Sequence, residues 1–223
     1  MSTIDPQVIA ARLTRERLGS YLAASGDDLD HAIQLYDWNA TVGASFYEDL
    51  GRVEVVFRNA IDEALTAYGV AQGWDSGWYR RDQLFPGKHG ARAREDIATA
   101  RSRATRRQVP ERHGKVIAEL SFGFWRFLCT PPYLTSLWVP ALVDAFPNHP
   151  DAGDPRAVRA GIDDHIQRLH FLRNRIAHHE PIHQRNLGRD QENLLELAGW
   201  ICADTRAWIS GASRVSTVLT QRP

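Results

Sequence analysis

Apolar residues recur at steps of three and four along most of this chain, which is the spacing of one face of an α-helix. The longest such series consists of Val42, Phe46, Leu50, Val53, Phe57, Ile61, Leu65 and Tyr68. It predicts a long amphipathic helix that Gly69 stops. Because no segment shows the strict alternation of a half-buried strand, the expected fold class is all-α, a helical bundle.

N-cap residues and prolines mark two further helices. The pair Asp5-Pro6 combines an N-cap with a first-turn proline and predicts an N-terminal helix to about residue 24. Asp154-Pro155 repeats this signature. The helix that it opens should end before Pro181, because the residue before a proline is disfavoured in the α region.

The spacing of apolar residues and the turn-forming residues also predict the elements between these helices and at the end of the chain. The pattern predicts a Trp- and Gly-rich loop at 69–79 and a basic helix at about 91–107. A helix that follows Pro110 carries ELSFGFWRFL (119–128), and a shorter helix follows at about 134–145. A last helix over about 190–210 carries one stripe formed by Leu194, Ala198, Ile201, Thr205 and Trp208. We expect a single domain over residues 1–223, with an N-terminal helix (1–26), a loop and basic insertion (69–110) and a helix pair (154–210).

Charge is unevenly distributed, although the net charge is zero. Residues 80–115 hold eleven Arg or Lys against four Asp or Glu, so this segment is positive and the rest of the chain is negative by the same amount. A basic segment in an acidic protein favours a polyanion partner, with a solvated helix face as the structural alternative. The candidate contacts to an RNA backbone are Arg92, Arg94, Arg101, Arg103, Arg106 and Arg107.

Two further features concern location. No apolar run approaches the roughly 20 residues that a membrane-spanning helix needs, and the N-terminus lacks an apolar signal segment. Two cysteines, Cys129 and Cys202, cannot form a disulfide framework. We therefore expect a cytoplasmic protein with no membrane partner.

Proton-handling groups gather in FLRNRIAHHEPIH (171–183). The string HEPIH formally matches the H-E-x-x-H zinc motif, which needs both histidines on one helix face. Pro181 lies between His179 and His183 and disfavours a continuous helix through them, and no third ligand stands at the usual spacing. We therefore expect neither a metal site nor another cofactor.

Two interpretations of this stretch remain. Cations in the last turns of a helix complement its dipole, which accounts for several of these residues. Alternatively, an arginine, an asparagine and a histidine suffice for metal-free RNA cleavage: the histidine exchanges protons with the ribose and the leaving oxygen, and the guanidinium stabilises the phosphate charge. One histidine cannot easily do both proton transfers, so this chemistry favours a symmetric dimer.

Arg173-Asn174-Arg175-Ile176-Ala177-His178 fits the R-x(4–6)-H motif of the HEPN superfamily. RNRIAHHEPI (173–182), EVVFRNAID (54–62) and LSFGFW (120–125) together resemble the Abi-like family, bacterial abortive-infection proteins related to the AbiD and AbiF types. The resemblance covers about residues 30–210. It implies a HEPN-type bundle, a homodimer with a shared cleft, and metal-independent endoribonuclease activity in phage defence or as a toxin, with an antitoxin or regulatory protein as a further partner.

The resemblance also assigns roles. Arg173 would clamp the phosphate, Asn174 would position it and His178 would act as acid and base, with His179 and Glu180 in supporting roles. Glu54, Arg58 and Asn59 form a second polar set. Glu54 and Arg58 are either an ordinary intrahelical ion pair or neighbours of the motif. SFGFW indicates packing, with Gly123 allowing close approach of another helix. The alternative function is a HEPN module that binds RNA, a nucleotide or a partner protein without cutting.

Overall fold

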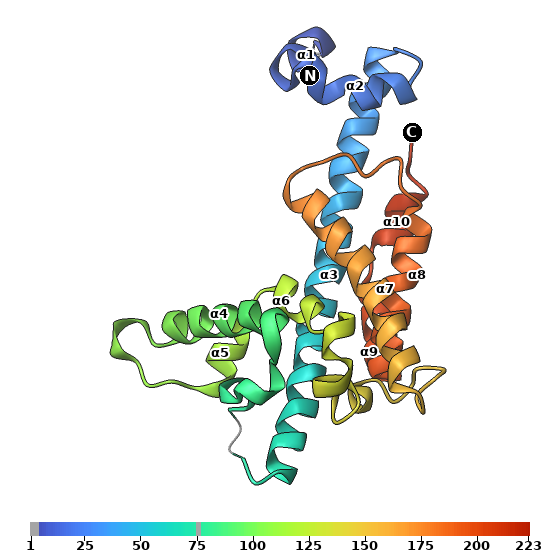
Figure 1. The fold of residues 1–223 in the computed structure, drawn as a ribbon. Coiled ribbons are helices and arrows are strands. Elements are labelled where there is room, and N and C mark those ends of the chain that lie inside the picture. Colours follow the sequence, from blue (N-terminus) through green and yellow to red (C-terminus); the bar gives the residue numbers. More distant parts are fainter. Residues whose placement is uncertain (1–4, 75–76) are drawn as a thin grey trace.

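The computed structural model describes residues 5–74 and 77–223, and its regular structure there is entirely helical, which confirms the all-α expectation. Its axis is α3 (Leu29–Ala71), which runs the length of the molecule (Figure 1). Asp28 caps this helix by accepting a hydrogen bond from the His31 amide (2.9 Å). The helix therefore begins earlier than its apolar series indicated, and it ends two residues after Gly69.

Four helices from the C-terminal part pack along α3. They are α7 (Pro155–Ala177), α8 (Leu187–Ile201), α9 (Ala203–Ala212) and α10 (Val215–Leu219). The Asp154-Pro155 signature is confirmed, because the Asp154 carboxylate accepts hydrogen bonds from the amides of Arg156 (2.9 Å) and Ala157 (3.2 Å). Together these helices form the bundle on which the candidate site is built.

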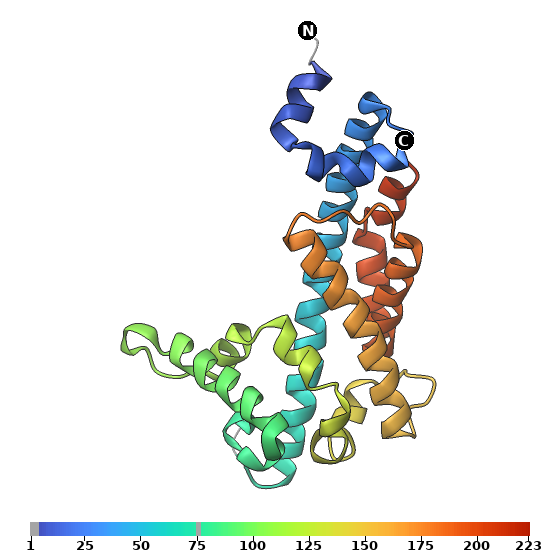
Figure 2. The same cartoon turned by 45° about the horizontal axis from the view of Figure 1, so that its top comes forward.

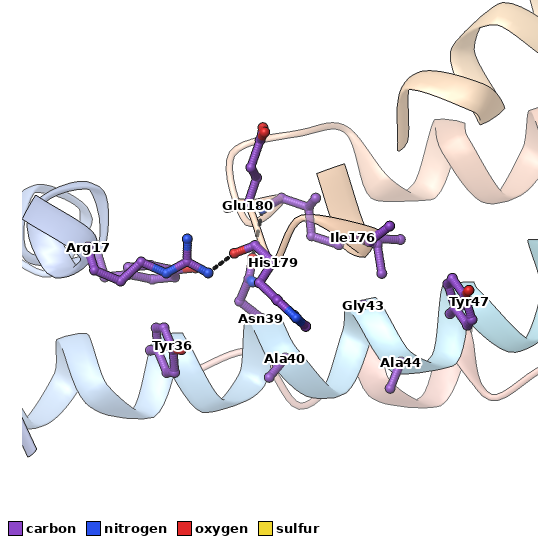
Figure 3. A pocket seen from close by; sticks show the side chains of 13 residues that line it. Arg17, Tyr36, Asn39, Ala40, Gly43, Ala44, Tyr47, Ile176, His179 and Glu180 are labelled. Carbon is purple, nitrogen blue, oxygen red and sulfur yellow. Dashed lines mark hydrogen bonds between the residues drawn. The ribbon is translucent and has the colours of Figure 1, made fainter. Parts of the chain in front are cut away.

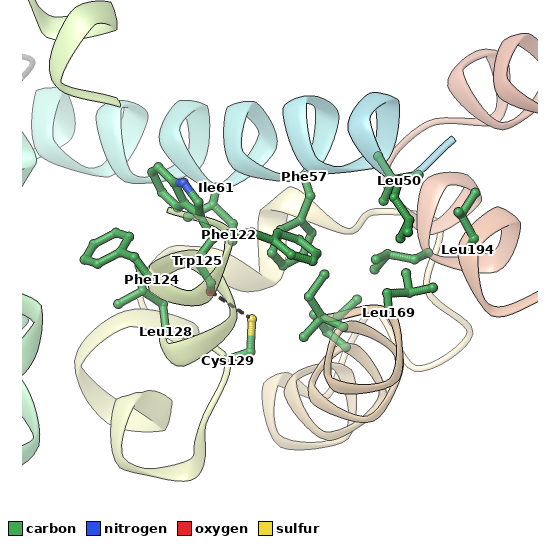
Figure 4. Close-up of a cluster of buried hydrophobic side chains, with 14 of the residues drawn as sticks. Leu50, Phe57, Ile61, Phe122, Phe124, Trp125, Leu128, Cys129, Leu169 and Leu194 are labelled. Atoms are coloured by element: carbon green, nitrogen blue, oxygen red, sulfur yellow. Dashed lines mark hydrogen bonds between the residues drawn. The ribbon is translucent and has the colours of Figure 1, made fainter. Parts of the chain in front are cut away.

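The core lies between α3, α7, α8 and the short helix α6 (Phe122–Phe127). Phe57 and Ile61 of α3 meet Phe122 and Trp125 of α6 in this layer (Figure 4). These side chains are almost fully buried, and each contributes about 1.5–3 kcal/mol by leaving water. The packing role expected for SFGFW is confirmed.

An arm formed by α4 (Gly87–Ala104) and α5 (His113–Glu119) projects from the bundle (Figures 1 and 2). Two short 3-10 turns, Trp78–Arg80 and Asp82–Leu84, join it to α3, while residues 75 and 76 of the predicted Trp/Gly loop lie outside the described residues. Asp62 of α3 accepts hydrogen bonds from the Trp78 indole (2.6 Å) and from His113 (2.8 Å). This carboxylate therefore fastens the base of the arm to the long helix.

The predicted N-terminal helix is in fact two helices, α1 (Pro6–Leu13) and α2 (Arg15–Ala24), and residues 1–4 lie outside the described part. Thr14 separates them with φ 70° and ψ 152°, and its hydroxyl accepts a hydrogen bond from the Arg17 amide. The prediction of one helix to residue 24 was wrong, because Thr14 ends the first helix and caps the second.

Two predicted helices in the middle of the chain are also interrupted. The helix through 119–128 breaks at Ser121, whose hydroxyl caps α6 by accepting from the Phe124 amide (3.2 Å). The helix predicted over 134–145 is replaced by a π-helical turn (Leu134–Trp138) and a 3-10 turn (Leu142–Ala145). Pro140 lies between these turns and cannot donate an α-helical hydrogen bond.

The last predicted helix breaks at Cys202, which has extended backbone (φ −160°, ψ 131°). Asn148 accounts for the break: its backbone amide bonds to the Trp200 carbonyl and its side-chain amide to the Gly199 carbonyl, both at 3.1 Å. The break rotates α9 relative to α8. Trp208, predicted on the apolar stripe, is therefore 55% exposed, and Ile209 is buried instead.

Candidate functional site

The R-x4-H motif lies on the last two turns of α7, and the helix ends in a Schellman arrangement. The His179 amide bonds to the Ile176 carbonyl (3.0 Å) and the Glu180 amide to the Arg175 carbonyl (2.7 Å). His179 adopts φ 56° at the position after the helix cap, where a left-handed residue is required. The helix thus ends before Pro181, as predicted, and His179 and Glu180 form its terminating turn.

Arg175 fastens this turn. Its Nε and Nη2 donate to the Pro181 carbonyl (3.1 and 2.6 Å), and its Nη1 lies 3.2 Å from a Glu180 carboxylate oxygen. The guanidinium also lies over the Phe171 ring, 5.7 Å from its centre. One arginine of the motif string therefore has a structural task, which the helix-end interpretation predicts.

The segment after the helix is held by α2 and α3. The Asn39 side-chain oxygen accepts hydrogen bonds from the amides of Ile182 (2.8 Å) and His183 (3.0 Å), and Arg17 donates to the His179 carbonyl. His183 is buried and stacks on Tyr21, with ring centres 4.6 Å apart. His179 and His183 are thus in separate settings, off any common helix. The sequence analysis missed Asn39, although a buried asparagine in an apolar helix face signals such a task.

Asn174 and His178 are placed differently from Arg175. Asn174 is half-buried and His178 is exposed at the helix cap, one turn later on the same face. Within residues 5–74 and 77–223, no hydrogen bond or ion pair engages either side chain. Both groups are therefore available to a ligand.

Arg173 acts electrostatically on Glu54 of α3 and on His170 of its own helix. We call the residues linked by these charge interactions the α7 cluster: Glu54, Arg58, Arg126, His170 and Arg173. Burial raises the pKa of Glu54, and the positive charges of Arg173 and Arg58 oppose that rise. The pKa of His170 is lowered by burial and, secondly, by the charges of Arg126 and Arg173. These interactions bring together Glu54, Arg58 and the motif, and add two residues, Arg126 and His170, that the sequence analysis had not singled out.

Asn59 lies elsewhere. It is exposed and lines a second pocket of about 580 Å³ with Glu63 and Cys202, on another side of α3 from Glu54. Asn59 is linked to the set through its side-chain oxygen, which accepts a hydrogen bond from Arg58 Nε at 3.4 Å. The structure therefore brings Glu54 and Arg58, rather than Asn59, close to the motif.

A pocket of about 540 Å³ opens beside the tail of α7 (Figure 3). Small residues of α3 form its floor and tyrosines form part of its walls, while Arg17 bridges to His179 above. Ala40, Ala44 and Tyr47 line the pocket, and the same face of α3 stays apolar and exposed beyond it at Gly51 and Val55. This face leads from the pocket to the α7 cluster.

The six arginines proposed from the basic segment fall into two groups. Arg94 donates to the Phe85 carbonyl, and Arg101 binds Glu111 (2.8 Å), so both brace the arm. The other four are exposed, and three of them lie at or near the tip of the arm: Arg92, Arg103, Arg106 and Arg107. Arg92 lies over the Phe127 ring, 5.7 Å from its centre. The far end of the arm lies away from α7 (Figure 2).

In the part of the chain that the structure describes, no helix is long and apolar enough to cross a bilayer. Within the same residues, no three His, Cys, Asp or Glu side chains gather as metal ligands would. Comparisons with known family models, with curated proteins and with solved structures find no match for this chain.

Proposed function

We propose that this protein is a metal-independent endoribonuclease of the HEPN type, acting as a homodimer in phage defence or as a toxin. The observation that carries the proposal is the position of Arg173, Asn174 and His178 on the last turns of one helix. Asn174 and His178 have no partner among the described residues, and Arg173 lies beside Glu54 rather than in an ion pair of its own. Groups of this kind, left without structural tasks, are what metal-free RNA cleavage requires.

The proposed reaction is an attack by a ribose 2′-OH on the adjacent phosphorus. A neutral imidazole takes the proton of the 2′-OH while the new O2′–P bond forms. A protonated imidazole gives its proton to O5′ as the P–O5′ bond breaks. The products are a 2′,3′-cyclic phosphate and a 5′-OH end. Arg173 would stabilise the charge on the phosphate oxygens and Asn174 would orient the group.

A second copy of the chain would supply the second imidazole. His178 is exposed at the helix cap, and the neighbouring α3 face at Ala40, Ala44, Tyr47 and Gly51 is apolar and uncovered. A contiguous apolar surface of this kind favours association, and a two-fold axis beside it would bring two His178 side chains to one groove. The exposed arginines of the arm would then bind RNA phosphates outside that groove.

The test is incubation of the purified chain with RNA in the presence of EDTA. We expect cleavage with 2′,3′-cyclic phosphate ends, lost in His178→Ala and retained in His89→Ala, which removes an exposed histidine on the arm. RNA binding that weakens with salt but leaves the RNA intact would instead favour the non-catalytic module. Cleavage that persists in His178→Ala would exclude the proposed mechanism.

A further inference from the structure

Helix α6 presents Arg126 to α7. A methyl group built on Gly123 would lie 3.6 Å from His170 Nε2, and the Phe122 ring centre is 5.7 Å from that of His170. Arg126 follows these two residues by three and four positions, so it lies on the same face of α6. Arg173 follows His170 by three positions on α7. The close approach at Gly123 therefore brings two arginines and a histidine together from separate helices.

Among the described residues Glu54 is the carboxylate that faces this group, and it balances the positive charge only in part. Over residues 5–74 and 77–223, no carboxylate lies within ion-pair distance of Arg126 or Arg173. Arg126 Nε is also buried with no hydrogen-bond partner among these residues. An unpaired buried donor costs about 1–3 kcal/mol. A ligand anion that accepts from Arg126 Nε itself would recover this cost.

The lowered pKa of His170 also indicates that the positive charges gather beside this imidazole. Burial lowers its pKa, and the charges of Arg126 on α6 and Arg173 on its own helix lower it further. Both guanidinium groups therefore act at the imidazole. An anion between them would be attracted by both, while a neutral imidazole can still donate one N–H.

We propose that Arg126 and His170 form a binding site for a phosphodiester of the RNA next to the one that is cut, while Arg173 keeps its role at the scissile phosphate. His170 precedes His178 by eight residues, which is about 12 Å along a helix, so an anion bound between His170 and Arg126 lies away from His178. The inference rests on the proposed function for the identity of the ligand. It assigns to Arg126 and His170 the task of holding the RNA strand, not of proton transfer.

The test measures binding of a 2′-O-methyl oligonucleotide, which lacks the nucleophile and cannot be cut. We expect Arg126→Gln and His170→Asn each to weaken binding about ten-fold. Loss of a phosphate contact should also lower the slope of log affinity against log salt by about 0.7. Arg168→Gln is the matched control, because Arg168 is an exposed arginine of α7 paired with Asp164. Affinities of both variants within two-fold of the wild type would overturn the proposal.

A second measurement follows the His170 imidazole by NMR. In the free protein Arg126→Gln should raise the His170 pKa, because it removes one of the two opposing charges, and the oligonucleotide should raise it in the wild type. An unchanged pKa in Arg126→Gln would overturn the site whatever the binding data. Wild-type protein that binds through Arg126 but never cuts RNA would contradict the proposed function alone.

Discussion

The arm and the α7 cluster are both rich in arginine, but they differ in what their arginines contact. At the base of the arm Glu111 accepts from Arg80 (2.6 Å) and Arg101 (2.8 Å), which fixes their positions. In the α7 cluster, Arg126 and Arg173 have no ion-pair partner among the described residues, and Glu54 stands alone against several cations. The count of charges along the sequence favoured the arm. The ion pairs in the structure instead favour the α7 cluster as the place that would hold an anion, because its arginines are not already paired with carboxylates among the described residues.

The largest expected effect is on the rate of RNA cleavage, and it should differ between the arginines of the α7 cluster and those of the arm. Arg173→Ala should lower the rate of RNA cleavage about 10²–10³-fold, because it removes charge that stabilises the transition state, and should leave the melting temperature nearly unchanged. Arg101→Ala should do the reverse, with full cleavage and a free energy of unfolding lower by about 0.5–1 kcal/mol. Single-turnover cleavage and urea unfolding of both variants measure this. A loss of cleavage in Arg101→Ala would place the arm in the active site.

The attachment of the arm is the next largest effect. Asp62→Ala removes the acceptor of the buried Trp78 indole and the partner of His113, so we expect a loss of about 2–3 kcal/mol in unfolding free energy. Glu63→Ala, which removes the exposed neighbouring carboxylate, should change it by less than about 0.5 kcal/mol. Equal effects of the two variants in urea titrations would show that Asp62 does not hold the arm.

The helices could be predicted well where one strong local signal decides them. The apolar series of α3 and the Asp154-Pro155 start of α7 are of this kind, because burial of a stripe and an N-cap depend on residues a few positions apart. The interruption at Cys202 could not be predicted in this way. The break at Cys202 depends on Asn148, more than 50 positions away, which binds the last carbonyls of α8.

Some residues of the candidate site could likewise be predicted from local sequence, and others could not. Arg173, Asn174 and His178 could be found from their spacing alone, since all three belong to one helix end. Arg126 and His170 could not, because their proximity depends on how closely α6 packs on α7 at Gly123. Likewise the sequence could not distinguish Arg94 and Arg101, which brace the arm, from Arg106 and Arg107, which are exposed. Charge counts carry no information about partners that come from other elements.

A smaller effect is expected at the tip of the arm. The double variant Arg106→Gln/Arg107→Gln should weaken RNA binding several-fold and lower the salt slope by about 1.4, because each lost phosphate contact contributes about 0.7. Cleavage at saturating RNA should be unchanged, since these residues would contribute affinity rather than chemistry. Filter binding over a range of salt concentrations measures the slope. An unchanged slope would mean that the α7 cluster alone meets the RNA.

The smallest expected effect is on the pH dependence of stability, through Glu54 of the α7 cluster and Glu111 of the arm. The pKa of Glu54 is raised and that of Glu111 is lowered. Burial raises the pKa of Glu54 above the usual 4.5. For Glu111 partial burial acts in the same direction, but hydrogen bonds from Arg80 and Arg101 outweigh it and lower the pKa. The folded protein therefore binds the Glu54 proton more tightly than the unfolded chain does, and the Glu111 proton less tightly.

The consequences for stability follow from these signs. The contribution of Glu54 is complete below pH 4.5 and is lost as pH rises through its raised pKa. The stability of Glu54→Gln relative to the wild type should therefore increase between pH 4.5 and 7. The contribution of Glu111 is present above pH 4.5 and is lost as pH falls through its lowered pKa, so Glu111→Gln should lose most at neutral pH. Urea unfolding across this range measures both. Parallel trends would show that Arg173 and Arg58 neutralise Glu54 as fully as Arg80 and Arg101 neutralise Glu111, and the α7 cluster would then have less free charge to offer a phosphate.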